Sequence, residues 1–180
     1  LDTEPLLDNV WCETAKKYNY YLSNDKLLEL KGRRKIDCAK KVLNWINKET
    51  PIEELLITQK LKVDKILSKA KPFKGAIELI KFCINTDLPI ALVTSSSSES
   101  FKIKSSFNAW LNLFETKVLG DDKFISNGKP SPDPYLRALK ILDVDPSKTW
   151  VIEDSYAGSV SALKAACNLM FFSKDIEILN

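Results

Sequence analysis

The stretch WVIEDSYAG, residues 150–158, decides the fold because an apolar run leads straight into two adjacent carboxylates. Residues 150–152 are continuously apolar, which is typical of a strand covered on both faces in a parallel sheet. Glu153 and Asp154 follow at the carboxyl end of this strand, the edge at which open α/β sheets bind ligands. Two such carboxylates repel each other unless a cation lies between them, and a hard divalent ion such as magnesium fits.

Strands and helices alternate from residue 71 to the end of the chain. Short apolar runs predict strands at residues 89–93, 118–119, 150–152 and 170–172. Helical spacing of apolar side chains predicts helices that include residues 76–83, 101–107, 134–142 and 156–167. Such a series predicts an α/β fold built on a parallel sheet. Residues 8–68, in contrast, show helical periodicity alone, so the pattern changes at residues 71–75.

Two further polar segments are expected at the same edge of the sheet. Thr94 and Ser95 follow the strand at 89–93, and their hydroxyls, with the N–H groups of the serine run, can cradle a phosphate. Lys129 lies in NGKPSPDPY, residues 127–135, where stiff prolines would hold one ammonium group in place. Hydroxyl, ammonium and paired carboxylates together are what phosphoryl transfer requires.

Each of these features also has a purely structural explanation. Asp154 or Ser155 can serve only as the cap of the helix that follows. The serine run can be a solvated turn, and Lys129 can be one of many surface lysines. The residue types alone leave these alternatives open.

The composition of the 180 residues is that of an ordinary globular protein, with 44% apolar and 28% charged residues. A net charge of +3 gives little support to nucleic-acid binding. No apolar run approaches the roughly 18 residues of a membrane span. Histidine-based catalysis and histidine-ligated zinc are excluded because the chain contains no histidine. The cysteines lack metal-ligand spacing, and we interpret them as buried free thiols of a reducing cytoplasm: Cys12, Cys38, Cys83 and Cys167.

The order of the motifs resembles the haloacid dehalogenase superfamily, in its β-phosphoglucomutase-like and sugar-phosphatase branch, which carries a helical cap. The matching stretches are LDTEPL at 1–6, KPFKGAIELI at 71–80, VTSSS at 93–97, GKPSPDPYLRAL at 128–139 and VIEDSYAG at 151–158. The resemblance implies a Rossmann-like parallel-sheet core with an inserted all-helical cap domain. Residues 1–7 would be the tail of the first core motif and the hinge, residues 8–70 the cap, and residues 71–180 the core.

The resemblance also implies roles for individual residues. Thr94 and Lys129 would bind and polarise the phosphate, and Glu153 and Asp154 would hold magnesium, with Asp154 the more direct ligand. Substrate contacts are expected from Ser95, Ser96, Arg33, Arg34, Lys35 and Glu4. The basic turn 33–35 lies where related caps reach toward the substrate, although a solvated helix start explains it equally well.

The nucleophilic aspartate of the superfamily, and the acid–base aspartate two residues later, lie just before the stretch that LDTEP resembles. We therefore expect the natural protein to carry residues before Leu1 that form a central strand with both aspartates.

The sequence is thus interpreted as a magnesium-dependent phosphatase that hydrolyses a small phosphorylated metabolite, a sugar or polyol phosphate, through an aspartyl-phosphate. One alternative is a phosphohexomutase of the β-phosphoglucomutase type, and another is a catalytically inactive module that binds a phosphorylated metabolite. The mutase relatives place a histidine at the position of Leu7, which favours hydrolysis here. We expect a cytoplasmic monomer or weak homodimer whose partner is its small substrate, with neither nucleic acid nor membrane.

Overall fold

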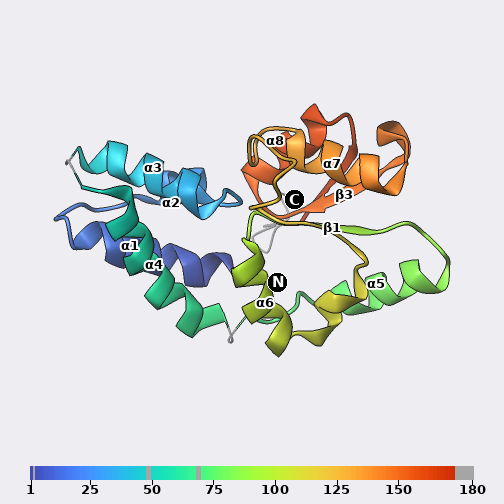
Figure 1. Ribbon diagram of the computed structural model, residues 1–180, viewed down its shortest axis with the longest axis horizontal. Coiled ribbons are helices and arrows are strands. Elements are labelled where there is room, and N and C mark those ends of the chain that lie inside the picture. Colours follow the sequence, from blue (N-terminus) through green and yellow to red (C-terminus); the bar gives the residue numbers. More distant parts are fainter. Residues whose placement is uncertain (2, 48–49, 68–69, 173–180) are drawn as a thin grey trace, which may run out of the picture.

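The computed structural model describes residues 1, 3–47, 50–67 and 70–172, and it shows an α/β fold with parallel strands in which helices predominate. Four helices come first in the chain: α1 (Glu4–Lys16), α2 (Asn24–Leu30), α3 (Lys35–Ile46) and α4 (Ile52–Leu67). They lie together on the left in Figure 1, to one side of the strands.

The four helices share one hydrophobic core, made of Trp11, Ala15, Leu22, Leu30, Cys38, Ala39, Val42, Ile46 and Leu55. A buried amide also ties α4 to α1. The side chain of Gln59 donates to the hydroxyl of Thr14 at 2.8 Å and to the carbonyl of Val10 at 3.3 Å. These contacts give the buried amide of Gln59 its hydrogen-bond partners.

Strands and helices alternate in the second part of the chain. The elements are α5 (Ala76–Asn85), β1 (Ala91–Val93), α6 (Ser98–Phe107), the 3-10 helix η1 (Ala109–Leu113), β2 (Thr116–Val118), α7 (Asp133–Leu142), the 3-10 helix η2 (Pro146–Lys148), β3 (Trp150–Glu153), α8 (Tyr156–Lys164) and β4 (Asn168–Phe171). In Figure 1, α7 and α8 lie above the strands, whereas α5 and α6 lie below.

The four described strands form two parallel pairs. β1 pairs with β2, with Val93 opposite Val118, and β3 pairs with β4, with Glu153 opposite Phe171. Among the described residues, no strand pairing joins β1 to β3. In a two-stranded sheet each strand keeps one edge without a strand partner, so both pairs retain room for a further strand.

The two faces of the strand layer are covered unequally. On one face α7 packs on β1, β2 and α8, and α8 packs on β3 and β4. The core there contains Tyr135, Leu139, Val151, Ala162, Ala165 and Cys167. In contrast, α5 has no buried residue, and Phe82 on it is exposed. Trp150, Ile152 and Met170 on the strands are exposed as well.

Element boundaries differ from the sequence expectations by a few residues. The helix predicted to reach Cys167 ends at Lys164, because Ala166 takes a φ of +60° and the N–H of Cys167 turns back to the carbonyl of Ala162 at 3.1 Å. This turn lets β4 start at Asn168, beside Trp150, earlier than expected.

All four cysteines are free thiols, as predicted. Cys38 and Cys167 are buried, and the other two are half-buried. None of the helices in the described ranges is long and apolar enough to cross a membrane.

Candidate active site

Lys129 is held in a buried position between β1 and β3. Its ammonium group donates to the carbonyl of Val93, the last residue of β1, at 3.1 Å. It also donates to Oε1 of Glu153, the last residue of β3. The side chains of Lys129 and Glu153 are only 6% and 7% exposed. The structure therefore brings the predicted lysine and one predicted carboxylate together at the carboxyl ends of two strands.

The loop that carries Lys129 is fixed by several hydrogen bonds. The carboxylate of Asp133, at the start of α7, accepts from the N–H of Asn127 at 2.9 Å and from the hydroxyl of Ser131 at 2.6 Å. The hydroxyl of Ser161 on α8 donates to the carbonyl of Ser131 at 2.5 Å. These contacts, together with the prolines of the segment, keep the backbone around Lys129 in one conformation.

Both oxygens of the Glu153 carboxylate are engaged. Oε1 accepts from Lys129 and from the hydroxyl of Tyr135, and Oε2 accepts from the hydroxyl of Ser155 at 3.0 Å. Gly158 makes room for this group, since a Cβ there would lie 2.1 Å from the carboxyl carbon of Glu153. Ser155 also accepts from the N–H of Gly158 at 3.0 Å, so it is the N-cap of α8 that one of our alternatives named.

The pKa values of Glu153 and Tyr135 are shifted by burial and by their neighbours. Burial alone would raise the pKa of Glu153, but the charge of Lys129 and the hydrogen bonds from Lys129, Tyr135 and Ser155 outweigh it and lower that pKa. Burial, and then the negative charge of Glu153, raise the pKa of Tyr135. Glu153 is therefore ionised at neutral pH, and Tyr135 remains a hydrogen-bond donor to it.

Asp154 differs from Glu153 in that its side chain is exposed. Its pKa is raised, first by desolvation and then by the charge of Glu153, while Lys129 acts in the opposite direction. In the part of the chain that the structure describes, no cluster of three or more histidine, cysteine or acidic residues is present. Asp154 offers the hard oxygen that magnesium prefers, whereas both oxygens of Glu153 already accept hydrogen bonds.

The hydroxyls after β1 are partly used within the protein. Thr94 accepts from the N–H of Ser96 at 3.2 Å through Oγ1, and its own N–H donates to the carbonyl of Val118 at 3.0 Å. Ser96 accepts from Lys104 at 2.8 Å, and Ser95 donates to the carbonyl of Gly32 at 2.7 Å. The expected substrate contacts of Ser95 and Ser96 therefore compete with these internal bonds.

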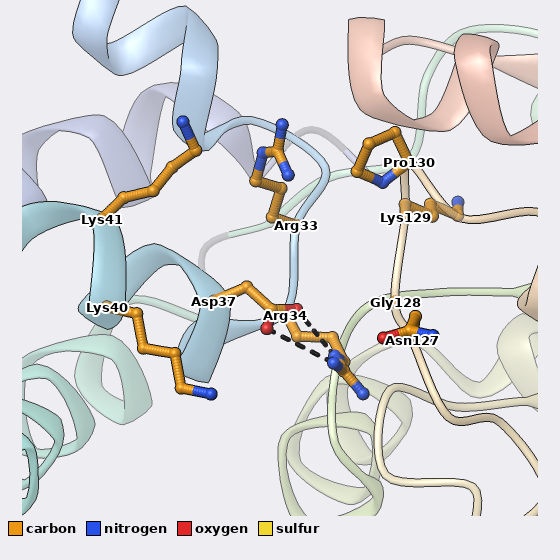
Figure 2. A pocket seen from close by; sticks show the side chains of 9 residues that line it. All are labelled: Arg33, Arg34, Asp37, Lys40, Lys41, Asn127, Gly128, Lys129 and Pro130. Atoms are coloured by element: carbon orange, nitrogen blue, oxygen red, sulfur yellow. Dashed lines mark hydrogen bonds and ion pairs between the residues drawn. The ribbon is translucent and has the colours of Figure 1, made fainter.

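A basic pocket of about 230 Å³ lies between the turn before α3 and the loop of Lys129. Its lining, shown in Figure 2, consists of Arg33, Arg34, Asp37, Lys40, Lys41, Asn127, Gly128, Lys129 and Pro130. Arg34 forms an ion pair with Asp37 at 2.7 Å, and Nε of Arg33 donates to the carbonyl of Glu29 at 2.8 Å. The side chain of Lys129 extends away from the other basic groups in this view.

Lys35 and Glu4 are the two remaining residues that were predicted to contact the substrate. Lys35 begins α3 and is not part of the pocket lining, whereas Arg33 and Arg34 are. Glu4 begins α1, but its side chain lies outside what the structure describes.

The helix predicted over residues 134–142 includes Tyr135, but the contact of its hydroxyl with Glu153 was not predicted from the sequence. A signal was present, because a tyrosine on a buried helical face needs a partner for its hydroxyl. The sequence reasoning also missed Gly32, whose carbonyl meets Ser95. No local pattern could have found that contact, since 62 residues separate the two in the chain.

The sequence and the fold define a class of hydrolase. Residues 1–172 match the family described as Haloacid dehalogenase-like hydrolase, and the chain belongs to this family. The resemblance drawn from the motifs is thereby confirmed.

Two relatives that match most of the chain are phosphatases by name. The chain is 26% identical over 176 residues to (DL)-glycerol-3-phosphatase 1, mitochondrial, of Arabidopsis thaliana, covering 94% of this chain and 59% of that protein. It is 28% identical over 169 residues to a phosphorylated carbohydrates phosphatase of Thermotoga maritima, covering 92% of this chain and 76% of that protein. The β-phosphoglucomutase structure from Clostridium difficile superposes with a TM-score of 0.80 at 19% identity, covering 96% of this chain and 77% of that one. At this identity the likeness shows the fold alone.

Proposed function

We propose that the protein is a magnesium-dependent phosphatase that hydrolyses a small phosphorylated sugar or polyol. The observation that carries the proposal is the buried Lys129 ammonium, held by Glu153 and by the carbonyl that precedes Thr94. A fixed positive charge at the carboxyl ends of two strands suits the stabilisation of charge on a transferring phosphoryl group.

Each residue has a defined task in this reaction. Thr94 and Lys129 would bind the phosphate oxygens, and the Lys129 charge would strengthen its hold as negative charge moves onto them. Asp154 would hold the magnesium ion, which when bound supplies positive charge to the phosphate. An aspartate carboxylate would attack phosphorus, forming an aspartyl-phosphate while the substrate alcohol leaves with a proton from a second aspartate; water then releases phosphate.

We further propose that both aspartates lie on a strand upstream of Leu1, between β1 and β3. One observation supports this position: the described strands form two separate pairs, and no strand pairing joins β1 to β3. An intact mass of the natural protein that equals that of residues 1–180 would contradict the proposal.

The basic pocket supports a role for Arg33 and Arg34 in contacting the part of the substrate that leaves as alcohol. Lys35 and Glu4 remain candidates for the same contact. The names of two relatives, a glycerol-3-phosphatase and a phosphorylated carbohydrates phosphatase, support sugar and polyol phosphates as the substrate class.

A panel of sugar and polyol phosphates, assayed with the full-length natural protein for phosphate release in the presence and absence of magnesium, tests the proposal. Magnesium-dependent release from one or a few members is the expected result. The panel includes β-glucose 1-phosphate with a bisphosphate primer. Formation of glucose 6-phosphate with little free phosphate would show a mutase, and no turnover of any member would show a binding module.

A further inference from the structure

Tyr135 touches both charged groups of the Lys129–Glu153 pair. Its hydroxyl donates to Oε1 of Glu153, the same oxygen that accepts from Lys129. The Lys129 ammonium also lies 5.0 Å from the centroid of the Tyr135 ring. Tyr135 is only 5% exposed, so these contacts are formed in a medium where electrostatic interactions are strong.

Packing alone does not account for this side chain. The ring fills a core with Leu139, Val151 and Ala162, and a phenylalanine would fill the same space. The buried hydroxyl, however, has its partner in Glu153, on a strand that begins eight residues after α7 ends. Its presence therefore serves the charged pair and not the apolar core around it.

The network also joins two separate segments. Lys129 and Tyr135 belong to one continuous stretch, the loop and the start of α7, whereas Glu153 ends β3. Ser155 completes the set by donating to the other carboxylate oxygen at 3.0 Å. With three donors around it, the Glu153 carboxylate has one fixed orientation, and the Lys129 ammonium is fixed with it.

We propose that Tyr135 is a positioning residue that holds Glu153, and through it Lys129, in the orientation needed for phosphoryl transfer. The proposal rests on the proposed function, because it gives Tyr135 a task in the same site. It also assigns Glu153 chiefly to anchoring the lysine, and leaves Asp154 as the carboxylate that faces outward.

The test compares Tyr135→Phe with the wild-type full-length protein and with Tyr21→Phe, which removes the hydroxyl of a tyrosine that is 86% exposed and belongs to the helical part. Two measurements are made: kcat and KM for the best substrate of the panel, and the rate at which acetic anhydride modifies Lys129, followed by mass spectrometry. The second measurement does not require turnover. Circular dichroism checks that each variant is folded.

Tyr135→Phe should lower kcat about tenfold, as expected for a lost hydrogen bond to a charged group, and leave KM within about twofold. Modification of Lys129 should become several-fold faster, because its carboxylate partner is less firmly held. Tyr21→Phe should match the wild type in both measurements. Unchanged kcat together with unchanged Lys129 modification in Tyr135→Phe would overturn the proposal. If the wild type hydrolyses no phosphate ester, the proposed function fails, and the modification rate alone decides whether Tyr135 holds Lys129.

Discussion

The backbone of Gly32, in the turn before α3, lies against the side chain of Ser155 at the start of α8. A Cβ added to Gly32 would fall 2.1 Å from Oγ and 2.6 Å from Cβ of Ser155, so rotation of the hydroxyl could not relieve the overlap. Gly32 also has a φ of +75°, a conformation that favours glycine. Through this close approach, the helical part of the chain, α1 to α4, packs directly against the candidate site.

Gly32→Ala should therefore destabilise the protein more than Gly75→Ala. Both variants introduce the strain of a positive φ, but nothing lies within 4 Å of the Cβ position at Gly75. We expect an additional loss of about 1 to 3 kcal/mol in the free energy of unfolding for Gly32→Ala, typical of overpacking, and a higher KM. Chemical denaturation measures the difference. Equal losses of unfolding free energy in the two variants would contradict close packing of the Gly32 turn against Ser155.

Lys129→Ala should lower kcat/KM on the order of a hundredfold or more, because it removes the charge that stabilises the transition state. It also leaves the buried carboxylate of Glu153 without its ion-pair partner, so the variant should be less stable as well. Steady-state kinetics with the substrate found in the panel measures the first effect. Lys148→Ala, at an exposed lysine of η2, is the control. A Lys129→Ala enzyme of near-normal activity would refute the role of this lysine.

Asp154→Asn should weaken magnesium binding and lower turnover strongly, since one formal charge is lost from a site for a divalent cation. The magnesium concentration that gives half-maximal activity, and direct titration calorimetry, both report the change. The matched control is Asp143→Asn, because Asp143 is exposed and its φ of +53° is readily adopted by asparagine. The same magnesium dependence in Asp154→Asn and the wild type would remove Asp154 from the metal site.

The loop of Lys129 should lose stability in acid through Asp133. The hydrogen bonds from Ser131 and from the N–H of Asn127 lower the pKa of this carboxyl. A lowered pKa means that the stabilisation is fully present above the unfolded-state value, about 4, and is lost as the pH falls through the folded-state value. Asp133→Asn should flatten this acidic part of the curve of unfolding free energy against pH. A curve in the variant that parallels the wild type down to pH 2 would contradict the prediction.

Local sequence patterns were sufficient to predict most elements of the fold. The helices of residues 8–68 follow from helical periodicity, and β3 follows from its apolar run. A central strand upstream of Leu1 was expected from the motifs. The pairing of β1 with β2 and of β3 with β4 was not predictable, because apolar runs indicate that strands exist but not which strands are neighbours.

The candidate site was predictable to the extent that it consists of charged residues following strands. Lys129 and Glu153 lie at the same edge of the strands, but their ion pair was not predicted. Their contact with Tyr135, and the contact of Gly32 with Ser155, depend on how distant segments pack, and periodicity carries no information about that.

Helix α7 packs against both strand pairs of the fold, directly on the first and through α8 on the second. Each strand pair, with the helix between its strands, is a local β–α–β unit. α7 is the element that bridges them, since it packs on both strands of the first unit and on α8 of the second. The loop of Lys129 leads directly into α7, so a displacement of this loop would be transmitted to the packing of both units.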